Sequence, residues 1–119
     1  ALSGVGFALN PADSGASYAT TGSLDGGKLI KIDPSTGEGT LIGITGLNAV
    51  PGLAINSAGK IYCTDDQGNL YRIDAVTGEA IFISNPPGIG SLTGIAFDNN
   101  DTLYVTTRYY RRLFIQNLL

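Results

Sequence analysis

The chain alternates short apolar runs with polar turns, and two of these runs recur at a nearly constant spacing. Residues 29–38 (LIKIDPSTGE) resemble residues 70–79 (LYRIDAVTGE), 41 positions later. Residues 52–64 resemble residues 94–106, 42 positions later, and a partial third copy begins at residue 6. Bulky and small side chains alternate within these runs, as expected for β-strands. The chain is therefore predicted to be a repeat protein built from short strands.

One repeat divides into four predicted strands joined by turns. In the central repeat the strands are expected at residues 52–56, 60–64, 69–74 and 79–84. Four strands in 41–42 residues are typical of one blade of a β-propeller. The first strand places Ala54 between bulkier neighbours, and the other repeats follow the same pattern. We predict that this strand is the innermost of its blade and is buried on both faces between adjacent blades.

A second motif, Asp-x-x-Thr-Gly, occurs at residues 33–37 and again at residues 74–78. It falls between the third and fourth predicted strands of its repeat. Asp and Thr side chains can accept hydrogen bonds from backbone N–H groups across a turn, and Gly can adopt a positive φ. The motif is therefore predicted to close a hairpin in each blade.

The strings LIKIDPSTGEGTLIG and GLAINSAGKIYCTDDQGNLYRID resemble the repeats of secreted bacterial propellers of the NHL, quinoprotein-like and lactonase-like groups. The resemblance covers about residues 4–107. It implies an all-β fold of antiparallel four-stranded blades and an extracellular or periplasmic location. Propellers with such repeats include binding modules, enzymes and scaffolds, so the resemblance leaves the function open. The chain has no Trp, so it lacks the Trp-Asp signature of one propeller group and the tryptophan docking of quinoprotein dehydrogenases.

The whole chain is interpreted as one partial propeller over residues 1–119, with blades at about 4–43, 50–84 and 92–116. The third blade is predicted to lack its outer strand. Propellers close with about four to eight blades, so nearly three blades leave the ring open and expose apolar faces at both ends. Either further sequence supplies the missing blades, or several copies of the chain complete a ring by cyclic symmetry.

The C-terminal segment departs from the repeat. Where the earlier blades have Asp, Gly and Asn in a turn, this segment has bulky and cationic side chains. Aromatic residues and Arg are enriched in protein interfaces, which makes the segment a candidate partner-binding surface. The alternative is an irregular third strand with a solvated Arg cluster. The candidate interface residues are Arg108, Tyr109, Tyr110, Arg111, Arg112 and Phe114.

Composition and charge narrow the classes of partner. The 119 residues include 10 acidic and 7 basic side chains, a net charge of −3, and hydrophobic residues make up 43%. This balance offers no broad cationic surface for nucleic acid, and no apolar run approaches the ~20 residues that span a bilayer. Because the chain starts at Ala1 and contains no Met, we expect a processed or excised product. A single Cys forbids an internal disulfide.

The residue types present argue against catalysis. The chain has no His, which removes the commonest general base and metal ligand. Cys63 aligns with Ala19 and Val105, so it is expected to be a buried filler rather than a nucleophile. The oxygen-rich segments 65–69 and 98–101 have the ligand types of Ca²⁺ sites, but both coincide with predicted turns, where Asp, Asn and Gly are favoured. No catalytic, cofactor-binding or metal-binding residue is predicted.

The repeat and the lack of catalytic groups predict a non-enzymatic propeller module, an interaction or scaffold unit for a protein partner or for further copies of itself. Two alternatives remain: a fragment of a lactonase-like or quinoprotein-like enzyme with catalytic residues outside this chain, and a structural subunit of a larger assembly. A glycan ligand would need equivalent pockets in successive blades, with Tyr18, Tyr62 and Tyr104 as the repeated aromatic residues. Their position on the second strand favours burial in the core or between blades.

Overall fold

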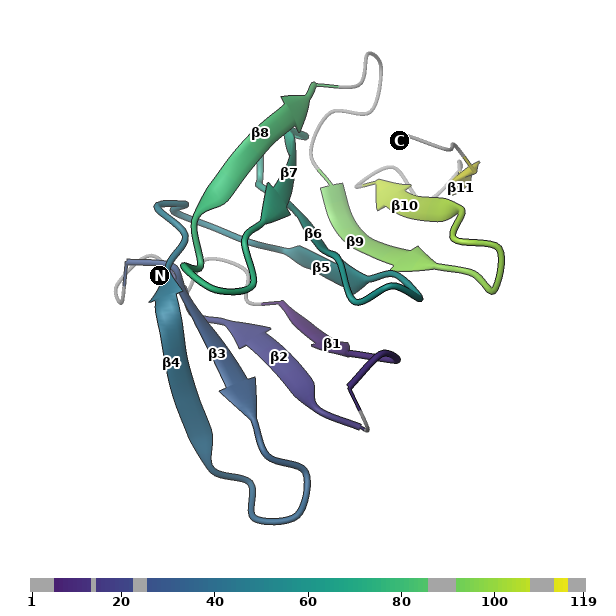
Figure 1. The fold of residues 1–119 in the computed structure, drawn as a ribbon. Helices are drawn as coiled ribbons and strands as arrows, with labels where there is room; N and C mark the ends of the chain where they lie inside the picture. Colours follow the sequence, from purple (N-terminus) through teal and green to yellow (C-terminus); the bar gives the residue numbers. More distant parts are fainter. Residues whose placement is uncertain (1–5, 14, 23–25, 86–91, 108–112, 116–119) are drawn as a thin grey trace.

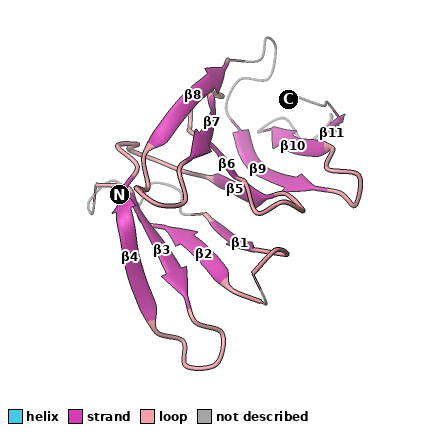
Figure 2. Cartoon of the chain, viewed as in Figure 1, coloured by secondary structure: helices cyan, strands magenta, loops and turns pink. Residues whose placement is uncertain are grey.

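The computed structural model describes residues 6–13, 15–22, 26–85, 92–107 and 113–115 as three antiparallel sheets without helices (Figures 1 and 2). Within each sheet the strands follow one another in chain order. The predicted fold class, antiparallel propeller blades in an incomplete ring, is confirmed. No helix in these ranges is long and apolar enough to cross a membrane.

The three sheets are called blades 1, 2 and 3. Blade 1 consists of β1 (Phe7–Leu9), β2 (Ser17–Thr20), β3 (Lys28–Ile32) and β4 (Gly39–Ile44). Blade 2 consists of β5 (Gly52–Ile55), β6 (Ile61–Thr64), β7 (Leu70–Ile73) and β8 (Ala80–Ser84). Blade 3 consists of β9 (Leu92–Phe97), β10 (Leu103–Thr107) and β11 (Leu113–Ile115). The chain thus forms nearly three blades, since the described part of blade 3 has three strands.

The first strand of each blade lies innermost. β5 runs between β1 and β9 and contacts both (Figure 1). All four residues of β5 are buried, as predicted, with Leu53 and Ile55 packed toward blade 1 and Ala54 packed toward blade 3. In β1, by contrast, Phe7 and Leu9 are exposed, because no described element lies on that side of blade 1.

The apolar core lies in two seams between blades. In the first seam, Tyr18 and Leu29 of blade 1 pack against a cluster in blade 2 that includes Cys63. In the second seam, Ala54 and Leu70 of blade 2 pack against blade 3. Buried apolar contact between neighbouring blades therefore holds the repeat together, as expected when a single repeat cannot bury its own faces.

The Asp-x-x-Thr-Gly motifs form the predicted hairpins between the third and fourth strands. Asp33 Oδ1 accepts a hydrogen bond from the backbone N–H of Ser35 at 2.8 Å, and Thr36 Oγ1 accepts one from the N–H of Glu38 at 3.2 Å. Gly37 has a φ of 76° and Gly78, in the second hairpin, a φ of 80°. A positive φ is unfavourable for residues with a Cβ, which accounts for the glycine at this position.

Candidate interaction surface

Blade 1 carries an apolar face that is uncovered within the described structure. We call the face of each blade that points toward the preceding blade position its leading face, and the opposite face its trailing face. Cross-strand partners share a face, so the strand register identifies the members. Phe7 is 62% exposed, Leu9 63% and Leu41 57%. The apolar members of the leading face of blade 1 are Phe7, Leu9, Ala19, Ile30, Ile32 and Leu41, and Ser17 and Gly39 share the face.

The same positions are buried in blade 2. Leu53 and Ile55 occupy in β5 the places that Phe7 and Leu9 occupy in β1, and they are only 5% and 7% exposed. They pack against the trailing face of blade 1, which includes the Tyr18 ring. The two leading faces have the same register and the same apolar character. Their difference in exposure therefore comes from the presence of a neighbouring blade.

Glycines on the trailing faces make room for side chains of the next blade. A Cβ added at Gly6 would lie 2.6 Å from the Cβ of Leu53. At Gly52 it would lie 3.2 Å from Cγ1 of Ile95. Carbon atoms in well-packed interiors stay about 3.5–4.0 Å apart, so neither glycine can be enlarged without moving its neighbour. Each seam thus seats a bulky residue of one blade over a glycine of the blade before it.

Blade 3 has an uncovered trailing face. Ala96 of β9 is exposed, whereas its counterpart Ala54 in β5 is buried. Tyr104 is half-buried, whereas Tyr18 and Tyr62 are buried at the equivalent positions. The two buried tyrosines confirm the predicted role in blade packing, and the ring of Tyr62 meets a ring of blade 3 edge to face at 5.4 Å. The described structure therefore has one uncovered face at each end.

The outer hairpin of blade 2 contacts the preceding blade, whereas the outer hairpin of blade 1 contacts no described residue at the equivalent glycine. A Cβ added at Gly78 would lie 2.8 Å from the Cα of Gly43, which belongs to β4. The hairpin of blade 2 therefore rests on the outer strand of blade 1. A Cβ added at Gly37, the same position in the hairpin of blade 1, would meet nothing within 4 Å.

A carboxylate links the loops of blades 2 and 3. Asp101 Oδ1 accepts a hydrogen bond from the backbone N–H of Ser57 at 2.9 Å, and Asp101 Oδ2 accepts one from the Ser57 hydroxyl at 2.6 Å. These bonds, the side-chain bond first, lower the pKa of Asp101. Asp101 has a φ of 59° and aligns with Gly59, whose φ is 81°. The residue thus adopts a conformation that favours glycine, and its side chain bridges two blades.

Thr20 in blade 1 and Thr64 in blade 2 occupy equivalent positions but differ in the hydrogen bonding of their hydroxyl groups. In blade 1, Thr20 Oγ1 accepts a hydrogen bond from the backbone N–H of Gly6 at 2.8 Å. In blade 2, Oγ1 of the equivalent Thr64 is buried and has no hydrogen-bond partner within the described structure. Buried hydroxyls are normally paired, so the Thr64 hydroxyl is a local weakness of the second seam.

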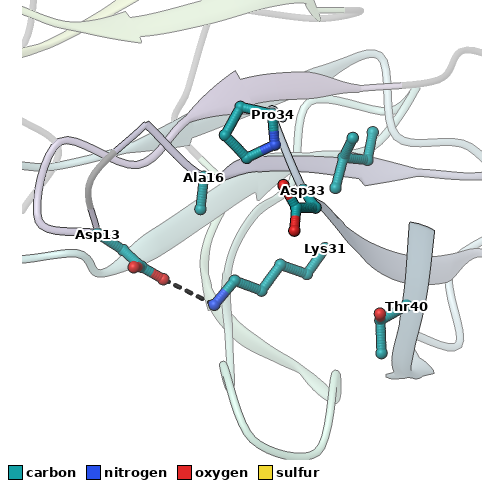
Figure 3. Close-up of a pocket in the computed structure, with 7 residues that line it drawn as sticks. Asp13, Ala16, Lys31, Asp33, Pro34 and Thr40 are labelled. Carbon is teal, nitrogen blue, oxygen red and sulfur yellow. Dashed lines mark hydrogen bonds and ion pairs between the residues drawn. The ribbon is translucent and has the colours of Figure 1, made fainter. Parts of the chain in front are cut away.

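Blade 1 also carries a surface hollow of about 400 Å³ beside its outer hairpin. Figure 3 shows Lys31 reaching toward Asp13 along one side, with Pro34 and Ala16 on the other. Lys31 Nζ lies 2.7 Å from Asp13 Oδ2, and this hydrogen bond raises the pKa of Lys31. The hollow therefore joins an ion pair to apolar walls, a combination suited to a small polar ligand.

Blade 2 has a smaller hollow, of about 200 Å³, at the equivalent place. Arg72 and Asp74 stand there where blade 1 has Lys31 and Asp33, 41 positions earlier. Neither hollow is lined by the repeated tyrosines, since Tyr18 and Tyr62 lie in the seams and Tyr104 lies on the trailing face of blade 3. Equivalent hollows thus occur in successive blades, but their volumes and charges differ.

The oxygen-rich segments form turns in which the carboxylates accept hydrogen bonds from their own loops. Asp65 accepts bonds from Gln67, from Asn69 and from the Tyr71 hydroxyl. Burial acts to raise the pKa of Asp65, but the bonds from Asn69 and Gln67 outweigh it and lower that pKa. Asp98 is held likewise, and the N–H of Thr102 contributes most to its lowered pKa. These contacts confirm the predicted turns. Among the described residues, no three His, Cys, Asp or Glu side chains gather at one point.

Cys63 is fully buried in the seam between blades 1 and 2, as predicted from its alignment with small apolar residues. Burial, followed by the charge of Asp65, raises the pKa of the thiol to about 12. At neutral pH the side chain is therefore a protonated thiol with apolar neighbours, which is the state of an inert core cysteine.

The predicted C-terminal interface residues 108–112 lie outside the described residues. Phe114 belongs to β11, where its backbone pairs with Val105 in the register of blade 3. Assignment of this segment as an interface stays a prediction. The candidate surface that the structure reveals lies instead on blade 1, where the sequence pattern predicts an exposed apolar face but not its register.

Comparison with known proteins shows the fold and leaves the family open. No family model matches the chain, and no curated protein matches it. A chain of a nidogen/laminin complex superposes with a TM-score of 0.70 and 20% identity, over 92% of this chain and 41% of that one. A gluconolactonase from Xanthomonas campestris gives a TM-score of 0.63 and 14% identity, over 89% of this chain and 34% of that one.

A PQQ-bound aldose sugar dehydrogenase from Streptomyces coelicolor also has a TM-score of 0.63, with 16% identity over 95% of this chain and 44% of that one. The predicted resemblance to lactonase-like and quinoprotein-like propellers is thus confirmed at the level of the fold. The chain spans less than half of the length of each of these proteins. Because they include enzymes and a component of a protein complex, their activities do not transfer with the fold.

Proposed function

We propose that this chain is a non-enzymatic propeller module that acts by association, with the leading face of blade 1 as its docking surface. The observation that carries the proposal is the matched pair of faces. Positions that blade 2 buries against a neighbouring blade are bare in blade 1, where Phe7, Leu9 and Leu41 are each more than half exposed. Contiguous apolar surface of this kind marks protein–protein contact sites.

The protonation states of the described side chains support a non-enzymatic role. Each resolved pKa shift moves its group away from neutral pH. Hydrogen bonds from turn donors, Ser35 first in the case of Asp33 and Val76 first in the case of Asp74, lower the carboxylate pKa values. Burial raises the pKa of Tyr71 to about 12. Catalytic acids and bases are usually tuned toward the working pH, so these groups are poor candidates for proton transfer.

We also propose an extracellular or periplasmic location in a bacterium, which rests on the resemblance of the repeat to those of secreted bacterial propellers.

The proposed docking surface is tested by substitutions on the leading face of blade 1. We expect the unmodified chain to have a native mass above the 12.3 kDa of one copy, and the variant Phe7→Asp/Leu41→Asp to have the mass of one copy. Light scattering over a range of concentrations measures both.

Val76→Asp is the matched control, because Val76 is an apolar residue 84% exposed at the tip of a hairpin and outside the leading face. It introduces a negative charge of the same kind, one where the double variant introduces two, and should leave the mass unchanged. A native mass of one copy at every concentration, for the unmodified chain and the double variant alike, would remove the leading face as a docking surface for the chain itself.

A second candidate is binding of a small glycan in the hollow of blade 1. The recurrence of a hollow at the same place in blade 2 favours it, since repeated pockets are the feature that glycan recognition by successive blades requires. Isothermal titration with simple hexoses should give binding that Lys31→Ala weakens and Lys28→Ala leaves intact, because Lys28 lines neither hollow. Equal, undetectable heats for the unmodified chain and both variants would end this candidate.

A further inference from the structure

We propose that the leading face of blade 1 binds the trailing face of blade 3 of a second copy, so that two copies join head to tail. This inference rests on the proposed function and names its partner. Each end of the described structure carries one half of the contact that is already made twice inside the chain, between blades 1 and 2 and between blades 2 and 3. The second copy therefore continues an existing type of interface.

The two internal seams give the register of the proposed contact. In both, a bulky residue of the leading face sits over the equivalent glycine of the blade before it, next to or within the inner strand: Leu53 over Gly6, and Ile95 over Gly52. Phe7 is the corresponding residue of blade 1, and Gly94 occupies the corresponding place in blade 3. We therefore expect Phe7 of one copy to pack over Gly94 of the other.

Neighbouring positions agree with this register. The trailing alanine, Ala54, packs with Ile95 and Phe97 of the next leading face, and the Tyr62 ring meets Phe97 edge to face. In blade 3 the corresponding alanine is exposed and the corresponding tyrosine is half-buried. A docked copy would cover that alanine with its own Phe7 and Leu9, in the arrangement of the second seam.

The repetition of one type of seam within the chain favours a second copy as the occupant, and ring closure is compatible with it. Each copy supplies three sheets, so two copies supply six, which is within the range of about four to eight blades that closed propellers have. A head-to-tail pair related by a two-fold axis makes the contact twice and covers both end faces. A single added blade of another kind would cover one end and leave the other bare.

The direction of the contact is tested by cross-linking variants that each carry one introduced cysteine besides Cys63, with a short bismaleimide. Phe7→Cys and Ala96→Cys are each prepared alone and then mixed. Head-to-tail docking predicts a covalent dimer in the mixture and none in either variant alone. The unmodified chain is the control, because Cys63 is buried and its thiol pKa is raised to about 12, so it should not react.

A dimer from Phe7→Cys alone would mean that two leading faces meet, which overturns the head-to-tail inference and leaves the proposed function standing. Ala96→Glu supplies an independent measurement. We expect it to shift the native mass from twice 12.3 kDa to one copy, as we also expect of Phe7→Asp alone and of Phe7→Asp/Leu41→Asp. A mass that Phe7→Asp lowers and Ala96→Glu leaves unchanged would also overturn the inference, whereas a mass of one copy for all chains would remove both proposals.

Discussion

The leading faces of blades 1 and 2 are a natural comparison within one molecule. Both are apolar, both have the same register, and both begin with a bulky residue on the inner strand, Phe7 in one and Leu53 in the other. Only the face of blade 2 is covered, and Leu53 is 5% exposed where Phe7 is 62% exposed. The pattern of residues thus defines a face that is able to dock, and the number of neighbouring blades decides whether it does.

The largest effect is expected from truncating the covered face. Leu53→Ala should lower the free energy of unfolding by about 2–5 kcal/mol, because it leaves a cavity in the seam. Phe7→Ala, at the same position of blade 1, should change the stability of a single copy by less than about 1 kcal/mol, because Phe7 is exposed there. Urea denaturation at a protein concentration low enough to keep the chain monomeric measures both. Equal losses would contradict the matched comparison.

A smaller difference in stability is expected between Ala substitutions at the two hairpin glycines, Gly37 and Gly78. Both have a positive φ, so Ala is strained at either position, at a cost of about 1 kcal/mol. Gly78→Ala should cost roughly 1–3 kcal/mol more, because its Cβ would meet the backbone of Gly43. Gly37→Ala is the control, and thermal unfolding ranks the two. A ranking in the opposite order would mean that the hairpin of blade 2 does not rest on blade 1.

Substitutions at the equivalent residues Thr20 and Thr64 should differ in stability by a similar amount. Thr20→Val should destabilise the chain by about 1–3 kcal/mol, because the buried N–H of Gly6 loses its acceptor. Thr64→Val should be neutral or stabilising, since its hydroxyl is buried without a partner. Urea midpoints of the two variants should therefore move apart. If Thr64→Val is as damaging as Thr20→Val, the Thr64 hydroxyl has a partner in solution.

The smallest effect concerns pH. The pKa of Asp101 is lowered in the folded chain, chiefly by the Ser57 hydroxyl, so its contribution is present above the unfolded value and is lost as pH falls through the folded one. The link between blades 2 and 3 should therefore weaken below pH 3.8, the ordinary value, and be constant near neutrality. Asp101→Asn should flatten the acid limb of a stability-against-pH curve, with Glu79→Gln as a control. An unchanged limb would remove Asp101 from the acid response.

Much of the fold could be predicted because each repeat carries its own strand and turn signals. The alternation around Ala54 predicts an inner strand buried on both faces, and β5 is such a strand. The hairpin motif specifies local hydrogen bonds and a positive φ, and both occur at Gly37. Alignment with Ala19 and Val105 is enough to predict that Cys63 is a core residue. These features depend on contacts within a blade or on the average character of its faces.

Contacts between blades could not be predicted in the same way, because they depend on the angle and distance at which sheets meet. The approach of Gly78 to Gly43 and the bridge from Asp101 to Ser57 join residues 35 or more positions apart, and no periodic pattern specifies them. One signal was present: Asp101 aligns with a glycine, which marks a position of positive φ. The candidate surface was predictable as an exposed end, but its register required the seam geometry.

Because Cys63 is buried, its reactivity can be used to measure local unfolding of the protein. Its thiol lies in the seam between blades 1 and 2 and reacts as a thiolate only after water reaches it. The rate of labelling by a small disulfide reagent therefore measures how often this seam opens under native conditions. Labelling that is faster than global unfolding would show that the seam between blades 1 and 2 opens locally, and docking at the leading face of blade 1 should slow the labelling if it stabilises that seam.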